Sequence, residues 1–112
     1  MKTNQLTSLL IKELTNAGIL CWRQNNQPTH DTKMNNGYGG YRAHNGMKGV
    51  PDVIAIIDGQ FIGLEVKAGK DRMSPEQILF KRRCERAGGK YVIIKEKEDV
   101  DKLLTSIVRT IV

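Results

Sequence analysis

Apart from Asp58 beside Gly59, three charged side chains interrupt the apolar stretch GVPDVIAIIDGQFIGLEVKAG, residues 49–69: Asp52, Glu65 and Lys67. Carboxylate oxygens are the ligands that Mg²⁺ prefers in proteins, and Mg²⁺ is usually held by one or two carboxylates together with waters and substrate phosphate. An ammonium group close to such a site can orient a water or balance charge on a phosphate in the transition state. If the fold brings the three side chains together, they are suited to metal-assisted chemistry on a phosphate.

The turn between these side chains predicts that they do meet. Asp58-Gly59 is the residue pair best suited to a two-residue type I′ turn, so we expect a hairpin of strands 52–57 and 60–67. Continuing its register sets Asp52 directly opposite Glu65, and strand alternation adds Lys67 to their face. Two opposed carboxylates repel each other. A divalent cation near them and near the Val66 carbonyl would compensate.

An alternative is that Asp52 starts a strand at a solvent edge and that Glu65 and Lys67 belong to an ordinary polar face. Two observations oppose it. The neighbouring strand positions are apolar on both faces, and a first helix at Asn4–Ala17 places Glu13 near the middle of its apolar arc, where a carboxylate is costly unless it is neutralised. That arc consists of Leu6, Leu9, Leu10, Leu14 and Ala17.

The remaining elements predict a single α/β domain over residues 1–112, of order α-β-β-β-α-β-α with a mixed central sheet. Residues 19–23 form a first strand. Ser74 caps a helix that starts at Pro75 and ends near Ala87, with Gln77 in a capping box. This helix and a strand at 91–95 complete a right-handed crossover from strand 60–67, and a last helix starts near Asp99. Residues 25–48 lack periodicity and predict a flexible loop that faces the substrate.

The charge of the chain favours a nucleic-acid partner. The formal net charge is +6 and the pI is about 9.5. Tyr38, Tyr41 and His44 alternate with glycines, which suits either base stacking or a plain surface loop. No stretch is long and apolar enough for a membrane span, and no signal peptide is present, so we expect a cytoplasmic protein. The expected phosphate contacts are Arg42, Lys48, Lys70 and Arg72.

Pro51-Asp52 followed by Glu65-Val66-Lys67 resembles the PD-(D/E)xK nuclease motif, and the whole chain resembles the VRR-NUC branch of that superfamily. The resemblance implies a restriction-endonuclease-like core and a Mg²⁺ cofactor that Mn²⁺ can replace. It implies that Glu13, Asp52, Glu65 and the Val66 carbonyl gather the metal, that Lys67 assists the attacking water, and that Gln77 supports the site. It also extends to Arg23 and Asn25, which either contact DNA or only end a strand.

The resemblance to stand-alone members of this family implies that the protein is a symmetric homodimer that cuts branched DNA, such as Holliday junctions. A nicking, flap-cutting or restriction-type nuclease would use the same chemical centre. A catalytically silent DNA-binding or assembly module would keep the fold without the reaction, and a basic domain with no nucleic-acid role is a further alternative.

Overall fold

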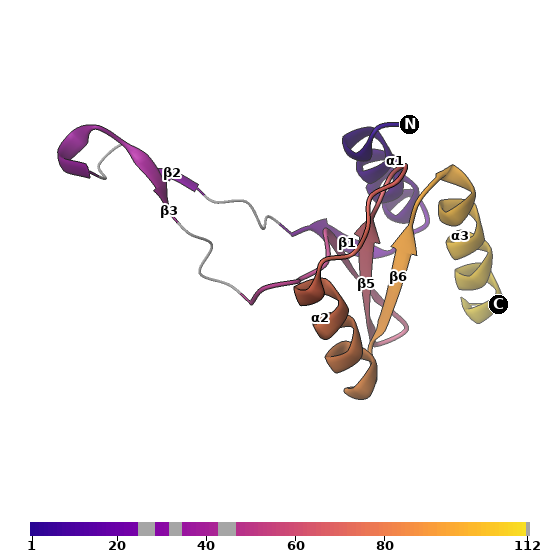
Figure 1. Cartoon of the computed structure of the whole chain (residues 1–112). Helices are drawn as coiled ribbons and strands as arrows, with labels where there is room; N and C mark the ends of the chain where they lie inside the picture. The colour runs from indigo at the N-terminus through magenta and orange to yellow at the C-terminus, as the bar shows by residue number, and fades with distance from the viewer. Residues whose placement is uncertain (25–28, 32–34, 43–46, 112) are drawn as a thin grey trace.

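The computed structural model describes residues 1–24, 29–31, 35–42 and 47–111, and its core is one mixed sheet between helices (Figure 1). The four-stranded sheet has the order β1-β4-β5-β6, with β1 (Leu20–Arg23), β4 (Val53–Ile57), β5 (Gln60–Val66) and β6 (Lys90–Ile94). The pairs β1–β4 and β4–β5 are antiparallel, whereas β5 and β6 are parallel and joined through helix α2 (Pro75–Arg86). The expected α/β class and core order are therefore confirmed.

The β4–β5 hairpin has the predicted turn and register. Asp58 and Gly59 have φ values of 53° and 76°, and a type I′ turn needs positive values at both positions. The pairing runs from Ile57↔Gln60 to Val53↔Leu64. Its next position is Asp52 opposite Glu65, so the turn determines which side chains meet at the far end of the hairpin.

The hydrophobic core lies on one face of this sheet, under helices α1 (Thr3–Asn16) and α3 (Lys97–Ile111). Helix α2 covers part of the other face, where it contacts β6. Among the described residues, no helix is long and apolar enough to cross a membrane. The buried core consists of Leu6, Leu10, Leu14, Val53, Ala55, Ile57, Ile62, Leu64, Val66, Ile94, Val100 and Ile107.

Helix α3 starts at Lys97, two residues before the predicted start at Asp99. The Asp99 carboxylate accepts hydrogen bonds from the backbone N–H groups of Lys95, at 2.8 Å, and Glu96, at 3.1 Å. Asp99 therefore caps the helix from inside its first turn, which is why an acid typical of a helix start stands slightly late in the sequence.

The segment 25–48 is not the plain loop that its composition predicts. It contains strand β2 (Thr29–Asp31), a 3-10 turn η1 (Asn35–Gly37) and strand β3 (Gly40–Arg42). The two strands pair only with each other, as a separate antiparallel ribbon that extends away from the core (Figure 1). Sequence patterns missed it because the strand sequences THD and GYR contain no alternation of aliphatic and polar residues. The flexibility predicted for 25–28, 32–34 and 43–46 lies outside the described residues.

One glycine holds the chain against helix α2 just before the Pro51-Asp52 pair. Gly49 has a φ of 81°, and a Cβ atom there would overlap the backbone carbonyl of Glu76. Gly59 has a similar φ of 76°, but a Cβ atom at that position would meet no other atom within 4 Å. Both positions disfavour L side chains, but only Gly49 also needs the close approach.

We expect Gly49→Ala to lower the free energy of unfolding by roughly 3 kcal/mol or more, and Gly59→Ala by only about 1 kcal/mol. The two variants are a matched pair because each places a Cβ atom on a residue with a positive φ. The difference between their losses of unfolding free energy therefore measures the contact with Glu76. Urea denaturation of the two variants measures it. Equal losses would show that the segment before Asp52 does not depend on this packing.

Candidate active site

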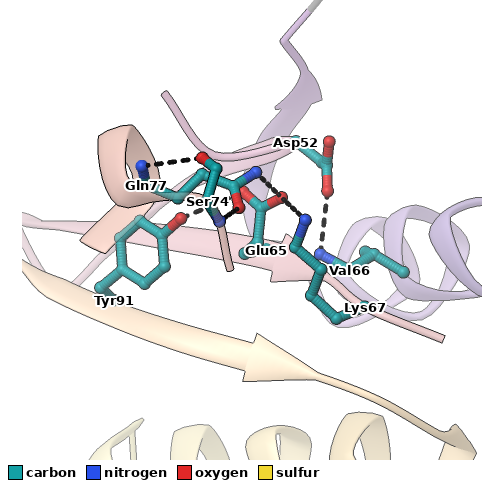
Figure 2. Close-up of polar contacts among 7 residues, drawn as sticks. All are labelled: Asp52, Glu65, Val66, Lys67, Ser74, Gln77 and Tyr91. Carbon is teal, nitrogen blue, oxygen red and sulfur yellow. Dashed lines mark hydrogen bonds and ion pairs between the residues drawn. The ribbon is translucent and has the colours of Figure 1, made fainter. Parts of the chain in front are cut away.

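Glu65 is the centre of a buried polar cluster at the end of β5 (Figure 2). It is 2% exposed, and side chains from two other elements contact its carboxylate. The Gln77 Nε2 group donates to Oε1 at 2.8 Å, and the Tyr91 hydroxyl donates to Oε2 at 3.0 Å. The Lys67 ammonium lies 3.6 Å from Oε1. Helix α2, strand β6 and the end of β5 thus each place one group against a single carboxylate.

Asp52 is held beside Glu65 by the end of the β4–β5 ladder. Its Oδ2 atom accepts a hydrogen bond from the Val66 backbone N–H at 2.9 Å. In a strand, the N–H and C=O of one residue point to the same side. The Val66 carbonyl oxygen therefore points toward the same side as Asp52, where the paired positions of β4 and β5 end.

Pro51 lies against Gly63 of β5, on the sheet face that also carries Tyr91. A Cβ atom on Gly63 would come within 2.9 Å of the Pro51 side chain and 3.3 Å of the Tyr91 ring. Pro51 is fully buried there. The Pro-Asp sequence is thus fitted to a small residue across the hairpin, which fixes where the Asp52 carboxylate starts.

The electrostatics of the cluster favour a proton or a cation. The pKa of Glu65 is raised to about 7, first because burial penalises its charged form and second because of the negative charge of Asp52. The hydrogen bond from Tyr91 and the charge of Lys67 act in the opposite direction and do not cancel these effects. Burial and the adjacent Glu65 also raise the pKa of Tyr91, so its hydroxyl stays a hydrogen-bond donor.

Gln77 fulfils both roles that its position in the sequence allows. Its backbone N–H donates to Ser74 Oγ at 3.2 Å, and its Oε1 accepts from the Ser74 backbone N–H at 2.8 Å, which completes the capping box. The Nε2 group that remains donates to Glu65. The cap therefore locks the amide in the orientation that presents a donor to the carboxylate.

Glu13 does not join this cluster. In the part of the chain that the structure describes, no three His, Cys, Asp or Glu side chains lie together as a metal-binding group. The buried positions of α1 are Leu6, Thr7, Leu10 and Leu14. The buried face of α1 is therefore rotated toward Thr7 relative to the predicted face. Of the predicted residues, Ala17 is exposed and Leu9 is only partly buried. Glu13 consequently lies at the border of the apolar arc, partly exposed, and its predicted burial is wrong.

The predicted DNA contacts come from separate segments of the chain. Arg23 ends β1 and donates to Asn4 at 3.1 Å, so its guanidinium lies against α1. Lys48, Lys70 and Arg72 are exposed. Arg42 lies in β3 with its side chain outside the described part, and Asn25 is outside the described residues altogether.

Tyr91 is the site residue that sequence reasoning missed. It stands in the strand sequence KYVII, which reads as a buried strand. A buried tyrosine needs a partner for its hydroxyl, and this was the available signal. Its partner could not be named, because the register of two parallel strands joined by a helix does not follow from a local turn.

The comparisons agree with the fold. A solved structure described as "VRR_NUC domain" superposes with a TM-score of 0.68, covering 92% of this chain and 94% of that one, at 18% sequence identity. No family model and no curated protein sequence matches the chain. At this identity the likeness shows the fold alone, and the predicted VRR-NUC-like architecture is confirmed over nearly the whole chain.

The raised pKa of Glu65 predicts how stability depends on pH. The folded protein holds the proton more tightly than the unfolded chain, so the stabilisation is complete below the unfolded value near 4.5 and is lost as the pH rises through about 7. Glu65→Gln removes this loss. We expect the variant to exceed the wild type in unfolding free energy by up to about 3 kcal/mol at pH 8, and the excess to vanish below pH 4.5.

Tyr91→Phe provides the matched second measurement because it removes only the hydroxyl that lowers the pKa of Glu65. We expect the Glu65 pKa, followed by the ¹³C chemical shift of its carboxyl carbon, to rise above its wild-type value in this variant. An unchanged titration in Tyr91→Phe, or a wild-type Glu65 that titrates near 4.5, would contradict this description of the site.

Proposed function

We propose that this protein is a divalent-metal-dependent endonuclease that hydrolyses phosphodiester bonds in DNA, with branched DNA such as a Holliday junction as its substrate. The observation that carries the proposal is the convergence of Asp52, Glu65 and Lys67 at one end of the β4–β5 hairpin, inside a fold like that of a VRR_NUC domain. The printed name of that structure supports a nuclease, and the chemistry of the cluster agrees with it.

The residues of the cluster fit a hard divalent ion such as Mg²⁺ or Mn²⁺. Two carboxylates, one of them with a pKa raised to about 7, lie next to the Val66 backbone, whose N–H donates to Asp52. Oxygen donors of this number and kind suit Mg²⁺. Asp52, Glu65 and the Val66 carbonyl would hold the ion. Glu13 is left out of this set because it forms no three-acid group with Asp52 and Glu65.

When bound, the ion supplies an acidified water and positive charge opposite the scissile phosphate. The chain's own residues prepare the site for that chemistry. Gln77 and Tyr91 fix the rotamer of Glu65 through one hydrogen bond to each carboxylate oxygen. The Lys67 ammonium lies 3.6 Å from Glu65 and is 17% exposed, so it can also contact a phosphate that approaches from solvent.

A dimer is part of the proposal because it accounts for a branched substrate. A chain of 112 residues has little surface with which to recognise a four-way junction alone, whereas two copies related by a twofold axis present two sites to opposing strands. Exposed cations at Lys48, Lys70 and Arg72 extend the positive surface around each site. Arg42 and Asn25 belong to the same proposed DNA contacts.

We expect Asp52→Asn to lower the rate of DNA cleavage by roughly 100- to 1,000-fold in Mg²⁺, because it removes a charged ligand and leaves the shape unchanged. Asp101→Asn, the same change at an exposed position of α3, should leave the rate unchanged. Cleavage of a labelled four-way junction measures both variants. Cutting in EDTA, or undiminished cutting by folded Asp52→Asn, would overturn the mechanism.

A second readout does not depend on cleavage. Mg²⁺ should raise the melting temperature of the wild type more at pH 8 than at pH 5.5, since Glu65 must lose its proton to bind the ion. Glu65→Gln should show no such pH dependence.

The substrate is tested by comparing duplex, flap, single-stranded and four-way-junction DNA under the same conditions. A dimeric resolving enzyme gives paired incisions across the junction and a dimeric mass in solution. A monomeric mass both free and on DNA would contradict the junction-resolving function. Binding of all four substrates with cutting of none would instead favour the silent DNA-binding module.

A further inference from the structure

We infer that the β2–β3 ribbon is a DNA-binding arm that enters the major groove of duplex DNA beside the candidate active site. This inference rests on the proposed function for its choice of DNA, and it concerns a part of the chain that the reaction itself does not use. Its evidence is the composition of the ribbon, its shape and the points at which it leaves the core.

The composition of the segment excludes a structural role in a hydrophobic core. Residues 24–48 contain no Val, Ile, Leu, Phe, Trp or Cys. They contain seven Asn and Gln residues, both histidines of the chain and three Lys or Arg residues, against Asp31 as the single acid. Amides and cations are the side chains that read base edges and bind phosphates. The segment therefore has the chemistry of a nucleic-acid surface without that of a packing element.

The extended shape of the molecule also indicates that the ribbon binds a partner. The molecule measures 57 × 30 × 28 Å, and its radius of gyration of 15.9 Å exceeds the roughly 13 Å expected of a compact chain of this length. The excess comes from the ribbon, which extends from the core in Figure 1. An isolated two-stranded ribbon is marginally stable in water, so a ribbon that pairs with no other described strand is best explained by a partner that it contacts.

The ribbon has the dimensions of a groove-binding element. Each strand has three residues, about 10 Å in length, and the major groove of DNA is about 12 Å wide and admits a two-stranded ribbon. The pairing Thr29↔Arg42 lies at the end nearer the core, and η1 with Tyr38 lies at the far end. Tyr38 is 93% exposed, an unusual state for a tyrosine that has no binding role.

Both ends of the segment leave the core at the candidate active site. The backbone N–H of Gln24 donates to the carbonyl of Asp52 at 2.7 Å. At the other end, Gly49 packs against the backbone of Glu76 and Gln77. A duplex bound by the ribbon is therefore tethered next to the Asp52–Glu65 pair. The arm would place duplex DNA at the site independently of the metal ion.

The test measures duplex binding in EDTA, so that cleavage plays no part. In one variant, residues 29–42 are replaced by a Gly/Ser linker of equal length. We expect its affinity for a 20-base-pair duplex to fall at least 30-fold, with a shallower dependence of the binding constant on salt because phosphate contacts are lost. We expect Tyr38→Ala to lower the duplex affinity about 5-fold, and Arg42→Gln to lower it about 10-fold. As a control, Lys102→Gln replaces an exposed charged residue of α3 and should lower the duplex affinity less than 2-fold.

Wild-type duplex affinity in the linker variant would overturn the inference, and so would a loss confined to single-stranded DNA. If the linker variant fails to fold, as shown by the loss of its urea transition, unchanged duplex affinities of both Tyr38→Ala and Arg42→Gln would overturn it. A wild type that binds duplex through the ribbon but cuts no DNA would support the arm while removing the proposed nuclease function, so the two failures are distinguishable.

Discussion

The burial of the Glu65 carboxylate is the constraint on which the arrangement of this protein depends. A charged carboxylate in a protein interior is costly unless hydrogen bonds and opposite charge compensate it. Two neutral donors, Gln77 and Tyr91, use one lone pair on each oxygen, and Lys67 contributes a partial counter-charge at 3.6 Å. Asp52 then adds a second negative charge, and the pKa of Glu65 rises to about 7. The chain thus brings two acids together at a place where either a proton or a divalent cation would relieve their repulsion.

Several features of the fold are explained by this one requirement. The Asp58-Gly59 turn sets the register that brings Asp52 opposite Glu65. Gly63 makes room for the buried Pro51, which precedes Asp52 in the chain. Helix α2 starts at a capping box whose glutamine also contacts the carboxylate. These are separate local devices, and each is common in proteins when it occurs alone. Their convergence on one carboxylate distinguishes a site from an ordinary polar strand end.

Local chemistry explains which parts of the structure could be predicted from the sequence. The hairpin register followed from two turn residues, and the start of α2 followed from Ser74 and Pro75, because a short segment determines each of them. Tyr91 was missed because its contact depends on parallel pairing across a crossover. The ribbon was missed because its strand sequences, THD and GYR, contain no alternation of aliphatic and polar residues. Glu13 was misplaced because small shifts in which helix residues pack moved the buried arc away from it.

The most direct test of the central claim is a crystal structure of the protein grown with Mn²⁺ at pH 8, where Glu65 is ionised, with the ion located by its anomalous scattering. The account predicts an anomalous peak in contact with the carboxylates of Asp52 and Glu65 and with the Val66 carbonyl oxygen. An ordered Asp52–Glu65 pair with no peak beside it, while Mn²⁺ occupies other positions in the same crystal, would contradict it.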